Sequence, residues 1–527
     1  MIRGATRAVP RTRLLTARVV VPVLVLVGAL ALYLRTGAPS ILTGDQAEHQ
    51  FTAYVVGVPH ATGYPLFTML NALAVWIVPW GDVARRVSIA VAVYSALAIV
   101  LVYKAGQRLG HSILAGLLAA ISLALAPEFW SLATIAEVYT LQALFMVALL
   151  LALLQWWELE AHDDLGLHLR GLRHPLAVGA LFAGLGVTHH GSFTPIVVPA
   201  LVVTVGAPLL LRLRNPEQRW PVIQLLGRCI GWGLLGLTPW LYLAAQYMMF
   251  RPFDYYRGQG LPYHPYWGNP QTWGDVINLA LGAGFRLKVF THGWSQLPAL
   301  VPGYLQELVR QFWWSGFVLG VVGAIHLLRR RLHVAWFLLF VWLSSSLFGL
   351  NVAADIPKAH VYFLPAYVIW SLWIGTGAVA VGQWLESIAA GPRRQHRFFL
   401  IVAAPLFIPP LAIGTYRFGR MDRSGDWDHR RTAEQILAYV EPNAAILCRW
   451  EACMTLRYLQ LVEGRSLGVQ LDQTEPEAGV RWSERVPLYA PRHPVYAISY
   501  NEELAARYIV FPIESVPDLW RVTEEER

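Results

Sequence analysis

The amino-acid sequence predicts an all-α polytopic membrane protein of about eleven transmembrane helices, with a small extracytoplasmic α/β domain at its C-terminus. Of the 527 residues, 56% are hydrophobic and only 14% are charged, a balance outside the range of ordinary soluble domains. Apolar segments of roughly 17 to 25 residues recur along the chain, each suited to a helix that crosses a bilayer. The net charge is +9, but the basic residues stand at the ends of apolar segments, so the charge indicates topology and no nucleic-acid partner.

The crossings are predicted near residues 17–36, 87–104, 112–130, 134–157, 175–190, 193–212, 221–249, 311–329, 333–350, 359–383 and 398–415. An arginine-rich N-terminus precedes the first of them and no clean A-x-A site follows, which favours an uncleaved helix over a cleaved signal peptide. With the N-terminus in the cytoplasm, every strongly basic short loop falls on the cytoplasmic side, as the positive-inside rule requires. The agreement with the positive-inside rule holds only if the apolar stretch Tyr64–Trp80 does not cross the membrane. We therefore expect an interfacial or re-entrant segment there.

The predicted organisation has four parts. Residues 1–16 form a cytoplasmic N-terminus, and residues 17–415 form a transmembrane module with a first external loop at 37–86 and a large one at 250–310. Residues 416–527 form the extracytoplasmic C-terminal domain. The large loop is rich in aromatic residues that either stack on sugar rings or belong to an interfacial belt: Tyr255, Tyr256, Tyr263, Tyr266, Trp267 and Trp273.

The C-terminal region has the composition of a soluble domain. Its pattern predicts helices over Thr432–Val440 and Cys453–Val462, with a short buried strand over Ala445–Arg449 between them. Cys448 and Cys453 could form a disulfide there, although the residues between them could also hold them apart.

Ionisable residues from distant parts of the chain fall on the extracytoplasmic side of this topology: Asp45, Glu48, His60, Glu128, Glu137, His189, His190, Asp254, Asp355, Lys358 and His360. An ion or proton path would instead distribute such groups through the middle of the membrane. The pattern therefore favours chemistry at one membrane face.

The loop after the first span, TGDQAEHQFTAYVVGVPHATGYPL, is the predicted chemical centre. Asp45 and Glu48 are spaced i, i+3, so a helical turn would carry both on one face, and either could be the base that accepts a hydroxyl proton. The alternative is a helix cap and a solvated loop. Further on, Gly63 and its neighbouring prolines interrupt helix and present His60 and Tyr64 on a turn, which could also be purely structural.

Three further segments carry candidate binding residues. Glu137, with Tyr139, begins an apolar span, where a carboxylate either serves function or stabilises the helix dipole. His189 and His190 could bind a phosphate or a sugar. Neighbouring side chains on a helix diverge, so they are not expected to share a metal. The alternative is one buried histidine and one cap.

The third segment, AADIPKAHVYFLPAY, contains Asp355, Lys358 and His360. A lysine at the membrane face suits an anionic phosphate, and an interfacial anchor is the alternative.

The motifs GDQAEH, GVPHATGYPL, IAEVYTLQ, LGVTHHGSF, YWGNPQTW and DIPKAHVYFLPAY occur in this order. In this respect the chain resembles the mostly bacterial family called domain of unknown function 2723, which is similar to the protein O-mannosyltransferases of the GT-C superfamily. The resemblance covers roughly residues 20 to 380, and the C-terminal region looks like the extracytoplasmic tail of bacterial members. Where the family has His-Pro-Pro-Gly-Tyr-Pro, this chain has alanine and threonine after His60.

The resemblance implies a GT-C-like bundle and a glycosyltransferase that uses a polyprenyl-phosphate-linked sugar and inverts the anomeric carbon. It maps the catalytic carboxylate to Asp45, with Glu48 as the second candidate. Together with the motifs, it assigns substrate binding to these residues: His60, Gly63, Tyr64, Glu137, Tyr139, His189, His190, Arg286, Asp355, Lys358 and His360. Of these, His189, His190, Arg286 and Lys358 would neutralise the leaving phosphate. No metal and no cofactor are expected.

The expected partners are a lipid-linked sugar donor, membrane lipids and an acceptor that is a protein, a glycan or a lipid. Mannose is favoured only by analogy with the mannosyltransferases. The alternative function is a transporter or flippase of a lipid-linked sugar, which predicts internal repeats and functional groups at mid-membrane depth. A third possibility is an inactive assembly partner. The expected location is the cytoplasmic membrane, with the site on its outer face.

Overall fold

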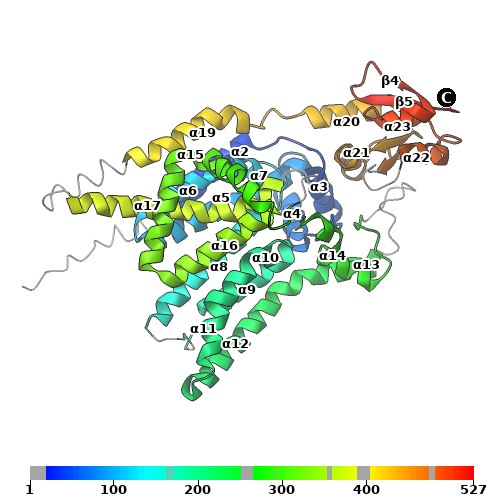
Figure 1. Cartoon of the computed structure of the whole chain (residues 1–527). Coiled ribbons are helices and arrows are strands. Elements are labelled where there is room, and N and C mark those ends of the chain that lie inside the picture. Colours follow the sequence, from blue (N-terminus) through cyan, green and yellow to red (C-terminus); the bar gives the residue numbers. More distant parts are fainter. Residues whose placement is uncertain are drawn as a thin grey trace, which may run out of the picture.

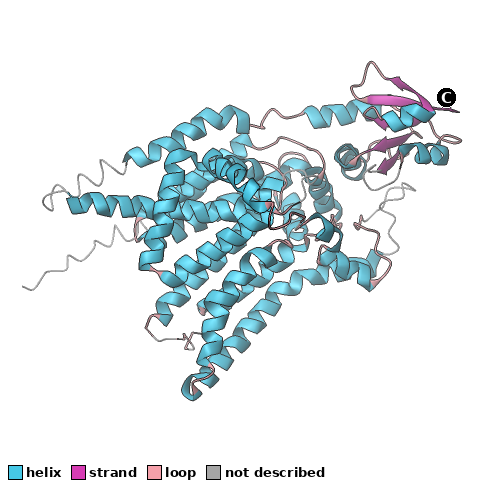
Figure 2. Ribbon diagram, viewed as in Figure 1, coloured by secondary structure: helices cyan, strands magenta, loops and turns pink. Residues whose placement is uncertain are grey.

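A computed structural model describes residues 19–162, 165–166, 168–169, 171–250, 265–289, 291–352, 359–388, 404–473 and 481–526. A large bundle of helices makes up most of the chain, and a small sheet with its own helices lies at one end of it (Figures 1 and 2). The C-terminus lies in this sheet region, and α19 (Ile408–Met421) leads from the bundle toward it.

Seven helices among the described residues are long and apolar enough to cross a membrane. They are α5 (Val83–Gly110), α8 (Tyr139–Glu160), Phe193–Arg212 with α10 (Phe193–Leu201) and α11 (Ala207–Arg212), Pro216–Phe250 with α12 (Pro216–Leu237) and α13 (Leu241–Phe250), α15 (Leu297–Arg330), α16 (Leu332–Leu350) and His360–Ile388 with α17 (Leu364–Ile388). The chain is thus a multi-pass membrane protein. These seven correspond to seven of the predicted crossings.

The other predicted crossings have shorter or broken helices. The segment 112–130 consists of α6 (Ile113–Ala124) and α7 (Pro127–Ala133), which meet at an angle of 70°. Pro127 at the start of α7 has no N–H to continue the α6 ladder, which explains the break. The segments 17–36 and 175–190 contain α2 (Val21–Thr36) and α9 (Pro175–His189), of 16 and 15 residues. The last predicted crossing, 398–415, lies partly outside the described residues. The total of about eleven crossings therefore stays a prediction.

Helix α4 (Pro65–Ile77) occupies the stretch that was predicted not to cross. It has 13 residues, fewer than the roughly 20 that a crossing needs. One face packs on α3 (Asp45–Val55) and α5, where the buried Asn71 accepts a hydrogen bond from the Tyr94 hydroxyl at 3.2 Å. The other face exposes Trp76 and Ile77. A helix that is too short to cross, with one face packed on the protein and the other exposed, agrees with the interfacial segment predicted for this stretch.

Close backbone contacts between small residues hold the bundle around α17. A Cβ on Gly323 of α15 would lie 1.9 Å from the Trp373 carbonyl oxygen, and one on Gly377 would lie 2.0 Å from the Leu319 carbonyl oxygen. Membrane helices pack in this way because, with apolar lipid on all sides, van der Waals contact drives their association. Helix α17 is consequently buried along most of its length.

The C-terminal sheet has five strands in the order β2-β1-β3-β5-β4. Strands β1 (Ala445–Cys448), β2 (Gln470–Gln473) and β3 (Val495–Ile498) are parallel, whereas β5 (Leu519–Glu526) and β4 (Tyr508–Pro512) pair antiparallel. The helices of this region are α20 (Asp428–Tyr439), α21 (Trp450–Glu463), α22 (Trp482–Tyr489) and α23 (Glu502–Arg507). The two predicted helices and the predicted strand are thereby confirmed.

Alternate residues of β1 face two separate hydrophobic clusters. Ile446 and Cys448 belong to the cluster that contains α20 and α21, and Ala445 and Leu447 belong to the cluster that contains α22. This alternation is the period of two expected for a strand buried on both sides. Cys448 and Cys453 form a disulfide, the pairing that the sequence left open.

The C-terminal sheet region is packed on the segment over residues 37–86. Ile41, Ala47, Phe51 and Ala84 share one hydrophobic cluster with the buried residues of α20, α21 and β1. Across this junction the Tyr458 hydroxyl accepts a hydrogen bond from the Ala84 backbone N–H at 3.0 Å. The bundle and the sheet region therefore share a core.

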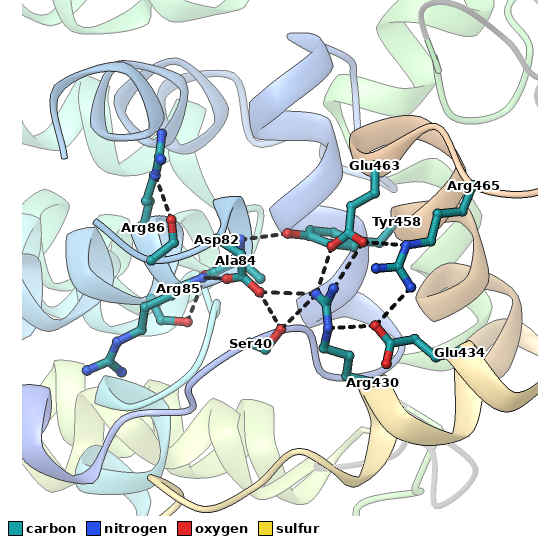
Figure 3. Close-up of polar contacts among 12 residues, drawn as sticks. Ser40, Asp82, Ala84, Arg85, Arg86, Arg430, Glu434, Tyr458, Glu463 and Arg465 are labelled. Carbon is teal, nitrogen blue, oxygen red and sulfur yellow. Dashed lines mark hydrogen bonds and ion pairs between the residues drawn. The ribbon is translucent and has the colours of Figure 1, made fainter. Parts of the chain in front are cut away.

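Arg430 forms the polar centre of this junction (Figure 3). Its guanidinium lies 3.3 Å from Asp82 Oδ2, 3.0 Å from Glu434 Oε1 and 2.7 Å from Glu463 Oε1, and the side chain is only 15% exposed. It also donates to Ser40 Oγ at 3.2 Å. Asp82 in turn caps α5 by accepting from the Arg85 backbone N–H. One arginine thus links the start of α5 to α20 and α21.

Replacing Arg430 with alanine is expected to loosen the junction, because three carboxylates lose their shared cation. Charge-assisted hydrogen bonds of this kind contribute about 1.5–3 kcal/mol each, so we expect faster limited proteolysis of the C-terminal region in detergent. Arg431→Ala is the matched control, since Arg431 is 68% exposed and pairs with the exposed surface residue Asp428 at 3.8 Å. Equal proteolysis rates in the two variants would contradict the role of Arg430.

Candidate functional site

The candidate site begins at the first turn of α3, which carries Asp45 and Glu48 as the i, i+3 spacing predicts. The Glu48 backbone N–H donates to the Gly44 carbonyl at 3.0 Å, so the turn is helical from its start. Both carboxylates lie at the positive end of the helix dipole, which favours their ionised forms. Their side chains nevertheless have different surroundings.

Asp45 is partly exposed, and its carboxylate contacts the C-terminal region. Its Oδ1 accepts a hydrogen bond of 2.7 Å from the indole Nε1 of Trp450, the first residue of α21. The backbone beside it is also attached to α21, because the Gly44 N–H and the Thr43 hydroxyl both donate to the Glu451 carbonyl oxygen, at 3.3 and 2.9 Å. Asp45 thus combines solvent access with a fixed orientation.

Glu48 is fully buried and is bound to His60. Its Oε1 accepts from the His60 backbone N–H at 3.0 Å, and its Oε2 lies 2.5 Å from His60 Nδ1. Burial raises the pKa of the Glu48 carboxyl, and His60 opposes that rise. Burial also disfavours the imidazolium, but the charges of Asp45 and Glu48 outweigh this and raise the pKa of His60 to about 9. The pair therefore keeps a shared proton across neutral pH.

Tyr64 fixes the other side of the His60 ring. Its hydroxyl donates to the Ala61 carbonyl at 3.1 Å, so it accepts from His60 Nε2 at 3.3 Å. Both imidazole nitrogens are then donors, in agreement with the protonated ring. Beneath this group lies the buried His49, whose ring centroid is 5.5 Å from that of His60 and 5.3 Å from that of Tyr64. Burial lowers the pKa of His49 to about 3, so its imidazole is neutral.

The turn that presents His60 is hydrogen-bonded to the large loop. The Val58 N–H donates to the Pro265 carbonyl at 2.8 Å, and the Trp267 N–H donates to the Val58 carbonyl at 2.9 Å. A Cβ on Gly57 would lie 2.7 Å from that Pro265 oxygen, so this close approach requires glycine. Gly63 has a φ of +77° and is the second position of the turn that favours glycine.

The candidate aromatic residues of the large loop that the structure describes have different surroundings. Trp267 faces the site, with its ring centroid 6.0 Å from that of His60. Tyr266 is buried and donates to the Leu243 carbonyl, and Trp273 packs on Tyr247 at 4.8 Å. Tyr255, Tyr256, Tyr263 and Asp254 lie outside the described residues.

Glu137 joins the site from the segment before α8. It is 3% exposed, and its Oε1 accepts a hydrogen bond from the Gln46 amide. Gln46 is the neighbour of Asp45, so this contact fixes the first turn of α3 against the bundle. Tyr139, two residues after Glu137, packs its ring 5.2 Å from His190 and 5.9 Å from Tyr362.

The two adjacent histidines diverge, as expected. His190 follows the end of α9, and its Nδ1 accepts from the Ser192 N–H at 3.1 Å. Its ring lies 5.8 Å from that of Tyr64. His189 is buried between Phe67 and Phe145, and its Nε2 donates to the Val138 carbonyl at 2.8 Å. Of the two, His190 is the one beside the Tyr64 turn.

His360 belongs to a second polar group. Its Nε2 lies 3.2 Å from Glu128 Oε2, and the side chain is 45% exposed. Two residues further, Tyr362 contacts both Tyr139 and His190, so the short helix η6 (Ala359–Phe363) joins this group to the site. Asp355 and Lys358 lie outside the described residues. Arg286 lies in η5 (Ala283–Lys288), but its side chain is outside the described part.

Sequence reasoning did not select four residues of this site: Gln46, His49, Trp267 as a neighbour of His60, and Trp450. The first two lie inside the GDQAEH motif, so the motif itself was the signal. Trp450 has no local signal, because it lies 405 residues from Asp45. Within the described ranges, no group of three or more His, Cys, Asp or Glu side chains is arranged to hold a metal ion.

The family profile described as "Protein O-mannosyl-transferase TMEM260 N-terminal domain" matches residues 45–207, which include the α3 turn, Glu137 and His190. Among curated proteins, the chain is 26% identical to the protein O-mannosyl-transferase tmem260 of Dictyostelium discoideum over 399 residues, or 69% of this chain and 45% of that protein. It is 28% identical to the mouse protein O-mannosyl-transferase TMEM260 over 222 residues, or 42% of this chain and 29% of that protein. The chain therefore spans less than half the length of these relatives.

Among solved structures, the fold is similar to ArnT from Cupriavidus metallidurans. The form bound to undecaprenyl phosphate gives a TM-score of 0.57 at 13% identity, covering 96% of this chain and 98% of that one. The apo form gives 0.58 at 14% identity, covering 95% and 97%. The similarity extends over nearly the whole of both chains, so the sheet region is included in the shared fold.

Proposed function

We propose that the chain is an inverting membrane glycosyltransferase of the GT-C, protein O-mannosyltransferase-like kind. It moves mannose from a polyprenyl-phosphate donor to a protein hydroxyl at the outer face of the cytoplasmic membrane. The names of the curated relatives support the sugar and the acceptor. The undecaprenyl phosphate bound by ArnT supports the class of donor.

The observation that carries the proposal is the environment of Asp45. It is a partly exposed carboxylate on the first turn of α3, held by Trp450 and placed beside the pair formed by the buried Glu48 and His60. A base that takes a hydroxyl proton has to reach the acceptor and keep its orientation, and Asp45 satisfies both requirements. Glu48 is the weaker candidate because both of its oxygens contact His60. We therefore assign Asp45 as the base and Glu48 as the group that positions His60.

The cationic His60 has a second role in this proposal. The leaving phosphate gains negative charge in the transition state, and a protonated imidazole held in place stabilises such charge without reorganising. Next to His60 lies a group of packed rings, formed by His190, Tyr64 and Tyr139. Such a group suits contact with the face of a sugar ring. Arg286, Asp355, Lys358 and His360 remain proposed donor-binding residues, of which His360 is exposed and paired with Glu128.

The proposed location on the extracytoplasmic face has two supports. The positive-inside rule puts the first external loop outside the cytoplasm. The disulfide of the C-terminal region is of a kind that persists in oxidising compartments. We therefore retain residues 416–527 as an extracytoplasmic domain attached to a transmembrane module over residues 17–415.

The test is a reconstitution in which the donor class is varied. The purified full-length protein in nanodiscs is offered radiolabelled mannose either on a polyprenyl phosphate or on a nucleotide, together with a membrane-protein extract as acceptor. Label on protein from the lipid-linked donor alone is the expected result. Label from the nucleotide sugar would overturn the donor class. In proteoliposomes, transbilayer movement of the intact lipid-linked sugar without cleavage would favour a flippase instead.

A further inference from the structure

We propose that the C-terminal sheet region takes part in catalysis through Trp450, which acts as a positioning residue for the Asp45 carboxylate. This inference rests on the proposed function, in which Asp45 is the base. The inference gives the sheet region a role in catalysis, in addition to its packing on the transmembrane module.

The contact itself is short and has a charged acceptor. The indole Nε1–H of Trp450 donates to Asp45 Oδ1 at 2.7 Å. Hydrogen bonds to a carboxylate at this distance are stronger than those between neutral groups. Indole is a donor only and does not titrate, so it orients the carboxylate without competing for the proton that the base receives.

The indole ring is held by other aromatic groups. Its centroid lies 4.8 Å from that of Trp267 and 6.2 Å from that of His60, in edge-to-face geometry at 90° and 89°. Such pairs contribute about 0.5–1.5 kcal/mol beyond their buried area. Trp267 is fixed through its backbone to Val58, in the turn that presents His60. Three segments distant in sequence therefore determine where the indole N–H points.

The backbone around Trp450 is fixed against the start of α3. Trp450 lies between Cys448 and Cys453, whose disulfide closes the connection from β1 to α21. The Glu451 carbonyl accepts two hydrogen bonds from Gly44 and Thr43. One turn along α21, the Thr455 hydroxyl donates to the Leu42 carbonyl at 2.9 Å. These hydrogen bonds hold the first turns of α21 against residues 42–45. A movement of the sheet region would therefore also displace the Trp450 indole from the Asp45 carboxylate.

A purely structural contact makes a different prediction from a positioning role. If Trp450 only attaches two parts of the chain, its loss lowers stability and leaves the protonation of Asp45 unchanged. If Trp450 positions the base, removing the N–H makes the ionised carboxylate less stable, so Asp45 takes up its proton at higher pH. The two readings are separated by a pH profile rather than by activity at one pH.

The deciding variant is Trp450→Phe in the full-length protein, which keeps an aromatic ring on the Trp267 side and removes the N–H donor. We expect the acid limb of the transfer profile to move up by about one pH unit, which corresponds to the loss of one hydrogen bond to a charged group. The kcat should fall about tenfold, with the KM for the lipid donor nearly unchanged. Trp450→His, which restores an N–H donor, should recover part of kcat.

The matched control is Trp482→Phe, the same change at a buried tryptophan of α22 in the other cluster of the sheet region. It should lower the melting temperature without moving the acid limb. A folded Trp450→Phe protein whose acid limb coincides with that of the wild type would overturn the proposal.

A readout independent of turnover separates this inference from the proposed function. A water-soluble carbodiimide modifies protonated carboxyls, so mass spectrometry of labelled Asp45 as a function of pH follows its protonation. The labelling midpoint should move upward in Trp450→Phe and stay in place in Trp482→Phe. If it moves while the wild type transfers no sugar, the catalytic role fails together with the proposed function, and only the contact stands. An unmoved midpoint overturns the positioning role even if the wild type is active.

Discussion

Replacing Asp45 with asparagine is expected to reduce sugar transfer by about 10² to 10⁴-fold, the usual contribution of a positioned general base. Asparagine has nearly the same shape, and its amide oxygen can still accept from Trp450 Nε1, so expression and the melting temperature should change little. Initial rates with a radiolabelled lipid-linked donor, measured on wild type and variant at equal concentration, check this result.

Asp428→Asn is the matched control for that measurement. Asp428 also lies in the first turn of a helix, α20, but its side chain is 86% exposed and it lies outside the site. Wild-type rates are expected for it. If Asp45→Asn transferred sugar as fast as Asp428→Asn, another group would have to be the base, and Glu48 would become the candidate.

Replacing His60 with alanine is expected to destabilise the fold by about 3–5 kcal/mol, since it leaves the buried carboxyl of Glu48 without its partner. The measurement is the melting temperature of the detergent-solubilised protein. His429→Ala, at an exposed position of α20, is the control and should melt like the wild type. The double variant Glu48→Gln, His60→Asn should recover part of the loss, because no buried charge then remains. A double variant as unstable as the two single changes combined would contradict the pairing.

The same pair predicts how stability depends on pH. Because the folded-state pKa of His60 is raised to about 9 from 6.5, the stabilisation is fully present below pH 6.5 and is lost as the pH rises through about 9. The melting temperature of the wild type should therefore fall over this interval, and that of the double variant should fall less. Parallel curves would show that His60 is not protonated in the folded protein.

The sequence predicted the parts of the structure that depend on local pattern. The pattern of apolar segments located the seven helices that are long and apolar enough to cross a membrane. The i, i+3 spacing placed Asp45 and Glu48 on one helical turn. The Gly-Pro turn around His60 followed from residues that interrupt helix. Single elements such as β1 and α21 were also predictable, because hydrophobic period and length determine them.

Contacts between distant segments were not predictable from one sequence. The loop after the first span contains both Glu48 and His60, but only the folded turn shows that their side chains meet. Trp450 reaches Asp45 across 405 residues, and neither its type nor its neighbours indicate a role in the site. The break between α6 and α7 was missed because the apolar pattern continues through Pro127. Hydropathy predicts burial in the membrane and does not predict the direction of the helix axis.

The central claim, sugar transfer from a lipid phosphate, is tested most directly by product stoichiometry. The purified protein is incubated with doubly labelled polyprenyl-phosphate-mannose and acceptor, and the released polyprenyl phosphate and the mannosylated acceptor are counted separately. We predict equal amounts of the two products, with neither formed by Asp45→Asn. Lipid-linked mannose that is bound or moved across the bilayer but never cleaved by the wild type would contradict the account.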